Sequence, residues 1–103
     1  MAPELIDLAE GEEIFSFEEQ GVYLLGRSPK CDIRLEDLRV SRRHCKFDYD
    51  GDNIYILDLH STNGTQVAFK DGETRYRRDI DERTMLEPGA QIFVGPRQLE
   101  IRG

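Results

Sequence analysis

The clearest structural signal in the chain is the run CKFDYDGDNIYILDL, which occupies residues 45–59. Apolar and polar residues alternate over 45–49, as in a half-buried strand, and a second segment rich in β-branched and aromatic residues spans 53–59. Asp50-Gly51 lies between them, and this pair suits hairpin turns because glycine adopts positive φ at little cost. The run therefore predicts two antiparallel strands joined by a tight turn.

Further short strands are expected on both sides of this hairpin. Upstream they cover residues 5–8, 14–17 and 22–25, of which 22–25 is expected to be buried, and downstream they cover 74–77, 91–94 and 98–101. Turns containing Gly or Pro at 71–72, 88–89 and 95–96 separate the downstream strands. No apolar pattern of helical period persists, so the spacing indicates an all-β sandwich or barrel.

Size and composition exclude several classes of protein. The chain has 103 residues, which predicts one domain over 1–103, and its net charge of −7 argues against general nucleic-acid binding. No apolar run is long enough to span a membrane. Two cysteines are too few for a disulfide framework or a zinc site, so we expect no metal. With no secretory signal at the N-terminus, we expect a cytoplasmic protein with reduced thiols.

The charges are unevenly distributed along the chain. Residues 1–20 carry seven acidic residues and no basic one, whereas residues 26–46 carry seven basic residues against three acidic ones. A local positive region on an acidic body suggests a focused anion site. The same charges could also be ordinary solvated charges of a loop.

Three polar motifs lie in segments expected to be loops. They are Gly26-Arg27, Ser41-Arg42-Arg43-His44 and Thr62-Asn63-Gly64. Together they offer guanidinium, hydroxyl, carboxamide and backbone N–H donors, which suit a phosphate or a carboxylate rather than an apolar ligand. Each motif alone is weak evidence, and the specificity lies in their order on an all-β chain.

In that order the motifs resemble the forkhead-associated (FHA) domain family. The resemblance rests on GR at 26–27, DIRL at 32–35, SRRH at 41–44, STNGT at 61–65 and LEPGAQIFVG at 86–95, and it covers about residues 5–101. It implies a two-sheet antiparallel β-sandwich of about eleven short strands. The termini would lie together, and the binding loops would lie at the opposite end.

The resemblance also implies a site for phosphothreonine peptides. By position, Arg27 and Ser41 would hold the phosphate, Arg42 and Thr62 would form a second layer, and Asn63 would bond the peptide main chain. Three residues would be structural at this site: Gly26, His44 and Gly64. Arg39 is a candidate for favouring an acidic residue three positions after the phosphothreonine.

The function expected from this resemblance is recognition without catalysis. The partner would be a phosphothreonine-containing protein or peptide, produced by an upstream serine/threonine kinase, and the isolated domain would be a monomer without a cofactor. Ser41 with His44 is a poor hydrolase pair, because no motif supplies the third, orienting acid. We expect Cys45 to be a small core residue and Cys31 to pack in the loop.

One segment departs from the family pattern. Between Val67 and Leu86 the sequence is longer than the short turn that is common in the family, which predicts a lengthened hairpin of uncertain register. Residues 74–83 hold four arginines among acidic residues: Arg75, Arg77, Arg78 and Arg83 against Asp79, Asp81 and Glu82. This could be a solvated strand or a second contact surface. The alternative function is therefore a phosphate-independent assembly module that uses its sheet faces or Thr74–Arg83.

Overall fold

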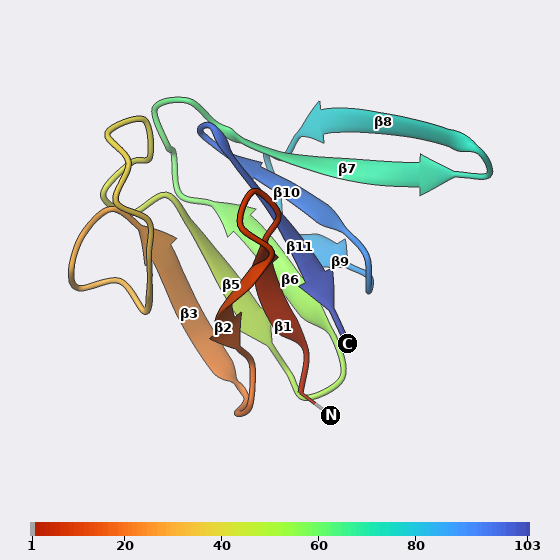
Figure 1. Ribbon diagram of the computed structural model, residues 1–103, viewed down its shortest axis with the longest axis horizontal. Coiled ribbons are helices and arrows are strands. Elements are labelled where there is room, and N and C mark those ends of the chain that lie inside the picture. The colour runs from red at the N-terminus through yellow and green to blue at the C-terminus, as the bar shows by residue number, and fades with distance from the viewer. Residues whose placement is uncertain (1) are drawn as a thin grey trace.

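The structure is a computed structural model that describes residues 2–103, with all their side chains except those of residues 70 and 71. The described residues form eleven strands and no helix, arranged as two facing sheets (Figure 1). The predicted all-β sandwich is confirmed. This part of the chain contains no helix that could cross a membrane.

Each sheet has a simple strand order. The first sheet runs from edge to edge through β2 (Glu12–Ser16), β1 (Glu4–Asp7), β11 (Arg97–Arg102), β10 (Gln91–Val94), β7 (Thr65–Asp71) and β8 (Thr74–Asp79). The second sheet runs through β4 (Ile33–Arg34), β3 (Gly21–Gly26), β5 (Cys45–Tyr49), β6 (Ile54–Asp58) and β9 (Thr84–Leu86). Neighbouring strands are antiparallel in every described pair except β3 with β4, which is parallel.

The hairpin that dominates the sequence pattern forms the centre of the second sheet. Cys45 pairs with Asp58 and Tyr49 pairs with Ile54, and the turn between them contains Gly51 at a φ of 99°. Every second residue of each strand faces the other sheet, so Phe47 and Ile56 are fully buried. The alternation in residues 45–49 therefore reflects one face in the core and one toward solvent.

The core between the sheets is aromatic at one end. Phe17 is fully buried, and the rings of Phe15, Tyr23, Phe47 and Tyr49 all have centroids within 6.1 Å of its own. Cys45 is also fully buried in this core, as predicted. The prediction that residues 22–25 are buried is wrong for Val22, which is 55% exposed because it lies on the solvent face of β3.

The two chain ends and the long loops lie at opposite ends of the sandwich (Figure 1). Near the termini, Glu4 of β1 is paired with Arg102 of β11. The loops of residues 27–44 and 59–64 gather at the other end, as the family resemblance implied.

The hairpin of β7 and β8 was only partly predicted. The sequence indicated a strand at 74–77 but none at 65–71 or 84–86, where β7 and β9 lie. β10 pairs with β7 only as far as Ala68, so the part of β7 beyond that residue is paired with β8 alone. The hairpin consequently projects past the rest of the first sheet (Figure 1).

Candidate functional site

Backbone hydrogen bonds join the loops at one end of the sandwich into a single unit. We call residues 27–44 and 59–64 the loop cluster. The amide of Arg27 donates to the carbonyl of Ser41 (3.0 Å), and the amide of Ser28 donates to Arg42 (3.1 Å). The amide of Leu59 donates to the carbonyl of His44 (2.9 Å), which links the second loop to the first. Segments distant in sequence are thus fixed against one another.

Gly26 is required by this close approach rather than by its φ. A Cβ built on Gly26 would lie 2.2 Å from the carbonyl oxygen of Arg42 and 3.0 Å from that of Ser41. Both contacts are with backbone, which cannot rotate away as a side chain can. Only glycine lets the end of β3 come close enough for the amides of Arg27 and Ser28 to form the two backbone hydrogen bonds described above.

His44 connects the two loops from inside. Its side chain is fully buried, and its Nδ1 accepts the amide N–H of Ser41 at 3.0 Å. That bond leaves the ring proton on Nε2, which donates to the carbonyl of Gly64 at 2.9 Å. One imidazole therefore bonds to two backbone groups, one in each loop.

The polar side chains of the cluster meet at its outer surface. The Ser41 hydroxyl accepts the amide N–H of Thr62 at 2.9 Å, and the Asn63 side-chain amide donates to the carbonyl of Arg39 at 2.9 Å. Arg27 donates from Nε to the carbonyl of Val40 at 3.2 Å. All the site residues expected from the sequence lie in or beside this cluster: Gly26, Arg27, Arg39, Ser41, Arg42, His44, Thr62, Asn63 and Gly64.

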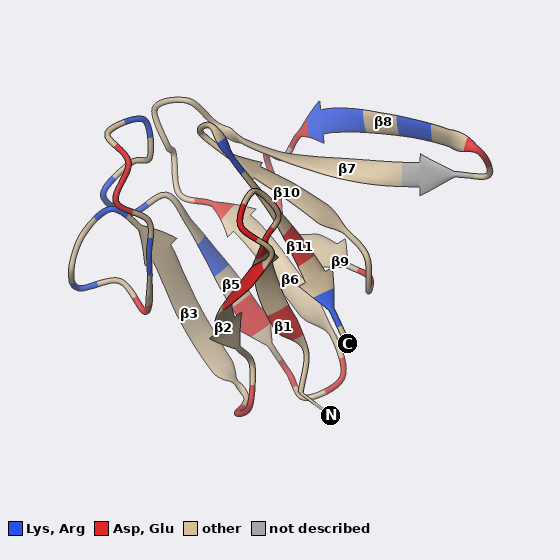
Figure 2. Cartoon of the chain, viewed as in Figure 1, with Lys and Arg blue, Asp and Glu red and all other residues tan. Residues whose placement is uncertain are grey.

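The exposure of these side chains suits a surface ligand. Arg27 and Ser41 are half-buried, whereas Arg42, Thr62 and Asn63 are exposed. Among the described side chains, Arg27, Arg42 and Arg43 form no ion pair with a carboxylate. Figure 2 shows the basic residues of these loops gathered at one end. The cluster can therefore bind an anion with guanidinium, hydroxyl and amide donors.

Asp58 is a residue that the sequence reasoning missed. It lies at the end of β6 and accepts from the Ser61 amide (3.1 Å), the Ser61 hydroxyl (2.5 Å) and the Thr65 hydroxyl (2.7 Å). Burial acts to raise the pKa of Asp58, but these hydrogen bonds outweigh it and leave the pKa below its usual value. The Asp-x-x-Ser spacing, typical of an Asx-type turn, was the available signal.

Arg39 is less available than the other arginines of the cluster. Its Nε and Nη2 donate to the two carboxylate oxygens of Asp37, each at 3.2 Å. The Arg39 side chain is nevertheless 69% exposed. It can meet an anionic ligand only by sharing its charge with Asp37.

Neither cysteine has an activated thiol. Burial raises the pKa of the fully buried Cys45 thiol, and partial burial raises the pKa of the Cys31 thiol, so neither thiol is activated. The Cys31 thiol donates to the carbonyl of Arg42 at 3.2 Å and so packs within the loop. In the described part of the chain, no group of His, Cys, Asp and Glu side chains is placed to hold a metal ion.

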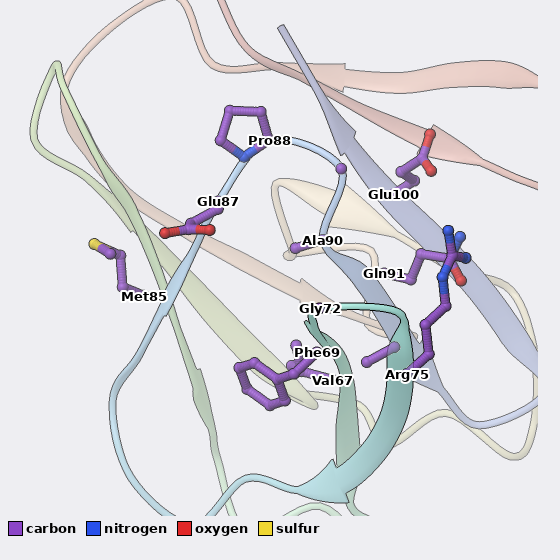
Figure 3. A pocket seen from close by; sticks show the side chains of 12 residues that line it. Val67, Phe69, Gly72, Arg75, Met85, Glu87, Pro88, Ala90, Gln91 and Glu100 are labelled. Atoms are coloured by element: carbon purple, nitrogen blue, oxygen red, sulfur yellow. The ribbon is translucent and has the colours of Figure 1, made fainter.

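A hollow of the described surface lies elsewhere. A pocket of about 730 Å³ opens beneath the projecting hairpin, between Phe69 and Arg75 on one side and Met85 and Pro88 on the other (Figure 3). None of the residues expected to form the site lines this pocket. The loop cluster is therefore separate from this pocket.

Comparisons of the sequence with known proteins point to one family. The family model described as FHA domain matches residues 23–95. The glycogen accumulation regulator GarA of Mycolicibacterium smegmatis is 48% identical over 70 residues, covering 68% of this chain and 39% of its own length. The chain spans about half the length of other curated relatives it matches.

Solved structures agree with this match over nearly the whole chain. The FHA domain of CT664 from Chlamydia trachomatis is 28% identical with a TM-score of 0.84, covering 100% of this chain and 98% of its own. EmbR of Mycobacterium tuberculosis, solved with a low-affinity phosphopeptide, is 26% identical with a TM-score of 0.82. That match covers 98% of this chain and 24% of EmbR.

Proposed function

The chain belongs to the FHA domain family, and from this premise we propose that it binds phosphothreonine-containing segments of partner proteins through the loop cluster. The observation that carries the proposal is that Arg27, Arg42 and Arg43, all without carboxylate partners among the described side chains, belong to the same loop cluster as the hydrogen-bonded pair Ser41 and Thr62. A phosphate carries a charge near −2 and bonds most strongly to arginine and short hydroxyl donors.

Each side chain has a free group for its proposed role. The Ser41 oxygen already accepts from Thr62, so its own O–H can donate to a phosphate oxygen beside the Arg27 guanidinium. Arg42 and Thr62 form the second layer around the phosphate. Asn63 donates to Arg39, which leaves its carboxamide oxygen to accept a peptide N–H.

Threonine is preferred over serine in this proposal because its γ-methyl can be buried against the loops. A buried methyl contributes about 0.8 kcal/mol, which corresponds to roughly a fourfold preference. Binding of a short extended peptide is expected at micromolar affinity, about −7 to −9 kcal/mol, because the peptide loses entropy when it is ordered.

Calorimetric titration with phosphothreonine, phosphoserine and unphosphorylated peptide pools tests the proposal. We expect binding to the phosphothreonine pool and none to the unphosphorylated pool. Arg27→Ala should weaken binding by about 1.5–3 kcal/mol, since it removes a charge-assisted contact. Arg102→Ala, on β11 and paired with Glu100, is the control and should bind as the wild type does. Unchanged affinity in Arg27→Ala would reject the site.

Arg39 is proposed to favour an acidic residue three positions after the phosphothreonine. The Asp37 carboxylate competes for the same guanidinium, so the preference should be small. An oriented phosphopeptide library measures it directly. Selection of an apolar residue at that position would exclude this role.

In the cell, this function makes the chain an adaptor rather than an enzyme. A serine/threonine kinase would act upstream and create the site on the partner, and the domain would bind as a monomer in the cytoplasm. Treating the partner with a phosphatase should abolish the interaction. Persistence after that treatment would favour phosphate-independent assembly instead.

A further inference from the structure

Six of the eleven arginines have no carboxylate partner among the described side chains, although the chain has 21 acidic residues. The five paired arginines are Arg34, Arg39, Arg83, Arg97 and Arg102. The other six form two groups: Arg27, Arg42 and Arg43 in the loop cluster, and Arg75, Arg77 and Arg78 on β8. We call the second group the β8 arginines. The absence of a carboxylate partner for all three among the described side chains marks β8 as a second surface suited to an anion.

The β8 arginines lie on an open edge of the first sheet. β8 pairs with β7 on one side only, and all six of its residues are exposed. Figure 2 shows basic segments along the length of this strand. An edge strand also leaves the N–H and C=O of every second residue unpaired, which another extended chain can use.

Two of these guanidinium groups are held in place. The Arg77 guanidinium lies 3.8 Å from the centroid of the Phe93 ring and donates twice to the side-chain oxygen of Gln66. The Arg78 guanidinium lies 4.6 Å from the centroid of Phe69. Both therefore present charge on a fixed surface, which lowers the entropy lost when a ligand binds.

This surface is continuous with the loop cluster. The end of β8 reaches Gly64, because a Cβ built on that glycine would lie 3.5 Å from Asp79 Oδ1. Beyond β8, the Ile80 amide donates to the carbonyl of Thr65 at 3.0 Å. From this junction β8 leads outward along the projecting hairpin (Figure 1). One extended ligand can thus contact both groups of arginines.

We propose that β8 is a second docking surface, which takes an extended acidic segment of the same partner that carries the phosphothreonine. This inference rests on the proposed function. Arg75 and Arg77 face one side of the strand and Arg78 faces the other, so a run of acidic residues can meet both faces. Asp79 lies between the two groups of arginines, so the acidic run must begin beyond the position opposite Asp79.

A peptide series tests this proposal. The first phosphothreonine peptide has neutral flanks. The second carries an acidic run joined by a Gly-Ser spacer and is made in two versions, with the run on the amino or on the carboxyl side of the phosphothreonine. The third is the second peptide with its acidic residues replaced by Gln and Asn. Each is titrated into the wild type, into Arg75→Gln/Arg78→Gln, and into Arg83→Gln/Arg102→Gln. The last variant is the control, because it also loses two positive charges but from ion-paired arginines outside β8.

We expect the acidic run on one of the two sides to tighten wild-type binding by about 3- to 10-fold, as two or three exposed charge pairs would. That gain should disappear in Arg75→Gln/Arg78→Gln and persist in the control variant, while both variants bind the neutral peptide as the wild type does. No gain in the wild type, or an equal gain in both variants, would overturn the proposal.

The remaining outcomes separate this proposal from the proposed function. If the neutral phosphothreonine peptide does not bind, the phosphothreonine site fails, and the β8 proposal falls with it. Sedimentation of the same proteins tests a second copy as occupant, since Glu12 and Glu13 make β2, at the opposite edge of the sheet, acidic. Self-association lost only in Arg75→Gln/Arg78→Gln, without a peptide effect, would assign β8 to that copy and overturn the proposal.

Discussion

Gly26 shows how little space separates β3 from the loop that crosses it. Replacing it with alanine would put Cβ 2.2 Å from the carbonyl oxygen of Arg42. The carbonyls of Arg42 and Ser41 that the new Cβ would meet both belong to the backbone, so the loop itself must move. We therefore expect Gly26→Ala to lower the free energy of unfolding by at least about 2 kcal/mol. Urea denaturation measures this, and phosphopeptide affinity should fall with it.

Gly72 supplies the matched control for that substitution. It has a φ of 62°, and a Cβ there would meet nothing within 4 Å, so alanine tests backbone conformation without a clash. Gly72→Ala should cost only about 1 kcal/mol. If Gly26→Ala proved no more harmful than Gly72→Ala, the close approach would not be what requires glycine.

The His44 tautomer gives a prediction that needs no substitution. The Ser41 N–H donates to Nδ1, so at neutral pH the ring proton should lie on Nε2 and bond to Gly64. Nitrogen-15 NMR of the imidazoles distinguishes the two tautomers. The other histidine, His60, is exposed and serves as the internal reference. A proton on Nδ1 of His44 would contradict the bridge between the loops.

Among whole segments, the 58–65 turn depends on one carboxylate. Asp58 has a lowered pKa, so its contribution to stability is present above the ordinary carboxyl range and is lost as pH falls through the lowered value. We expect Asp58→Asn to cost about 1–2 kcal/mol near pH 7. That difference from the wild type should shrink as the pH falls below about 4 and through the lowered pKa of Asp58, because both side chains are neutral once Asp58 is protonated. Thermal unfolding of both proteins across pH measures it, and a gap independent of pH would contradict it.

The predictability of the strands followed from how much of each was buried. The 45–58 hairpin could be predicted because one face of each strand lies in the core and its turn contains Asp-Gly. β8 lies wholly in solvent, so its residues carry no alternation that would set its register. β9 has three residues, too few for a periodic pattern.

The candidate site residues differ in how far their role depends on contacts that form only when the chain folds. Arg27, Ser41 and Asn63 could be named as candidates because the order of the motifs that contain them resembles the FHA family pattern. Asp58 carried only the local Asp-x-x-Ser spacing as a signal, because its hydrogen bonds to Ser61 and Thr65 exist only once the turn has folded around it. The second group of arginines was visible as sequence, but some of the ion pairs that separate it from the other arginines join residues far apart in the chain, such as Arg83 with Asp48.

For the molecule as a whole, net charge and local charge oppose each other. The chain carries −7, so its long-range field repels an anionic peptide, whereas the six arginines without a carboxylate partner among the described side chains attract it at contact distance. Salt screens both effects, and the sign of the salt dependence shows which one dominates.

We expect local attraction to dominate, because charge-assisted bonds to phosphate act over a few ångströms while the acidic residues are distributed over the surface. Raising NaCl from about 50 to about 500 mM should therefore weaken phosphothreonine peptide binding by about 3- to 10-fold. The peptide with the acidic run should lose more than the neutral one, since it makes additional exposed ion pairs. Calorimetry at both salt concentrations measures this. Tighter binding at high salt would mean that net repulsion controls association and that the two groups of arginines contribute little.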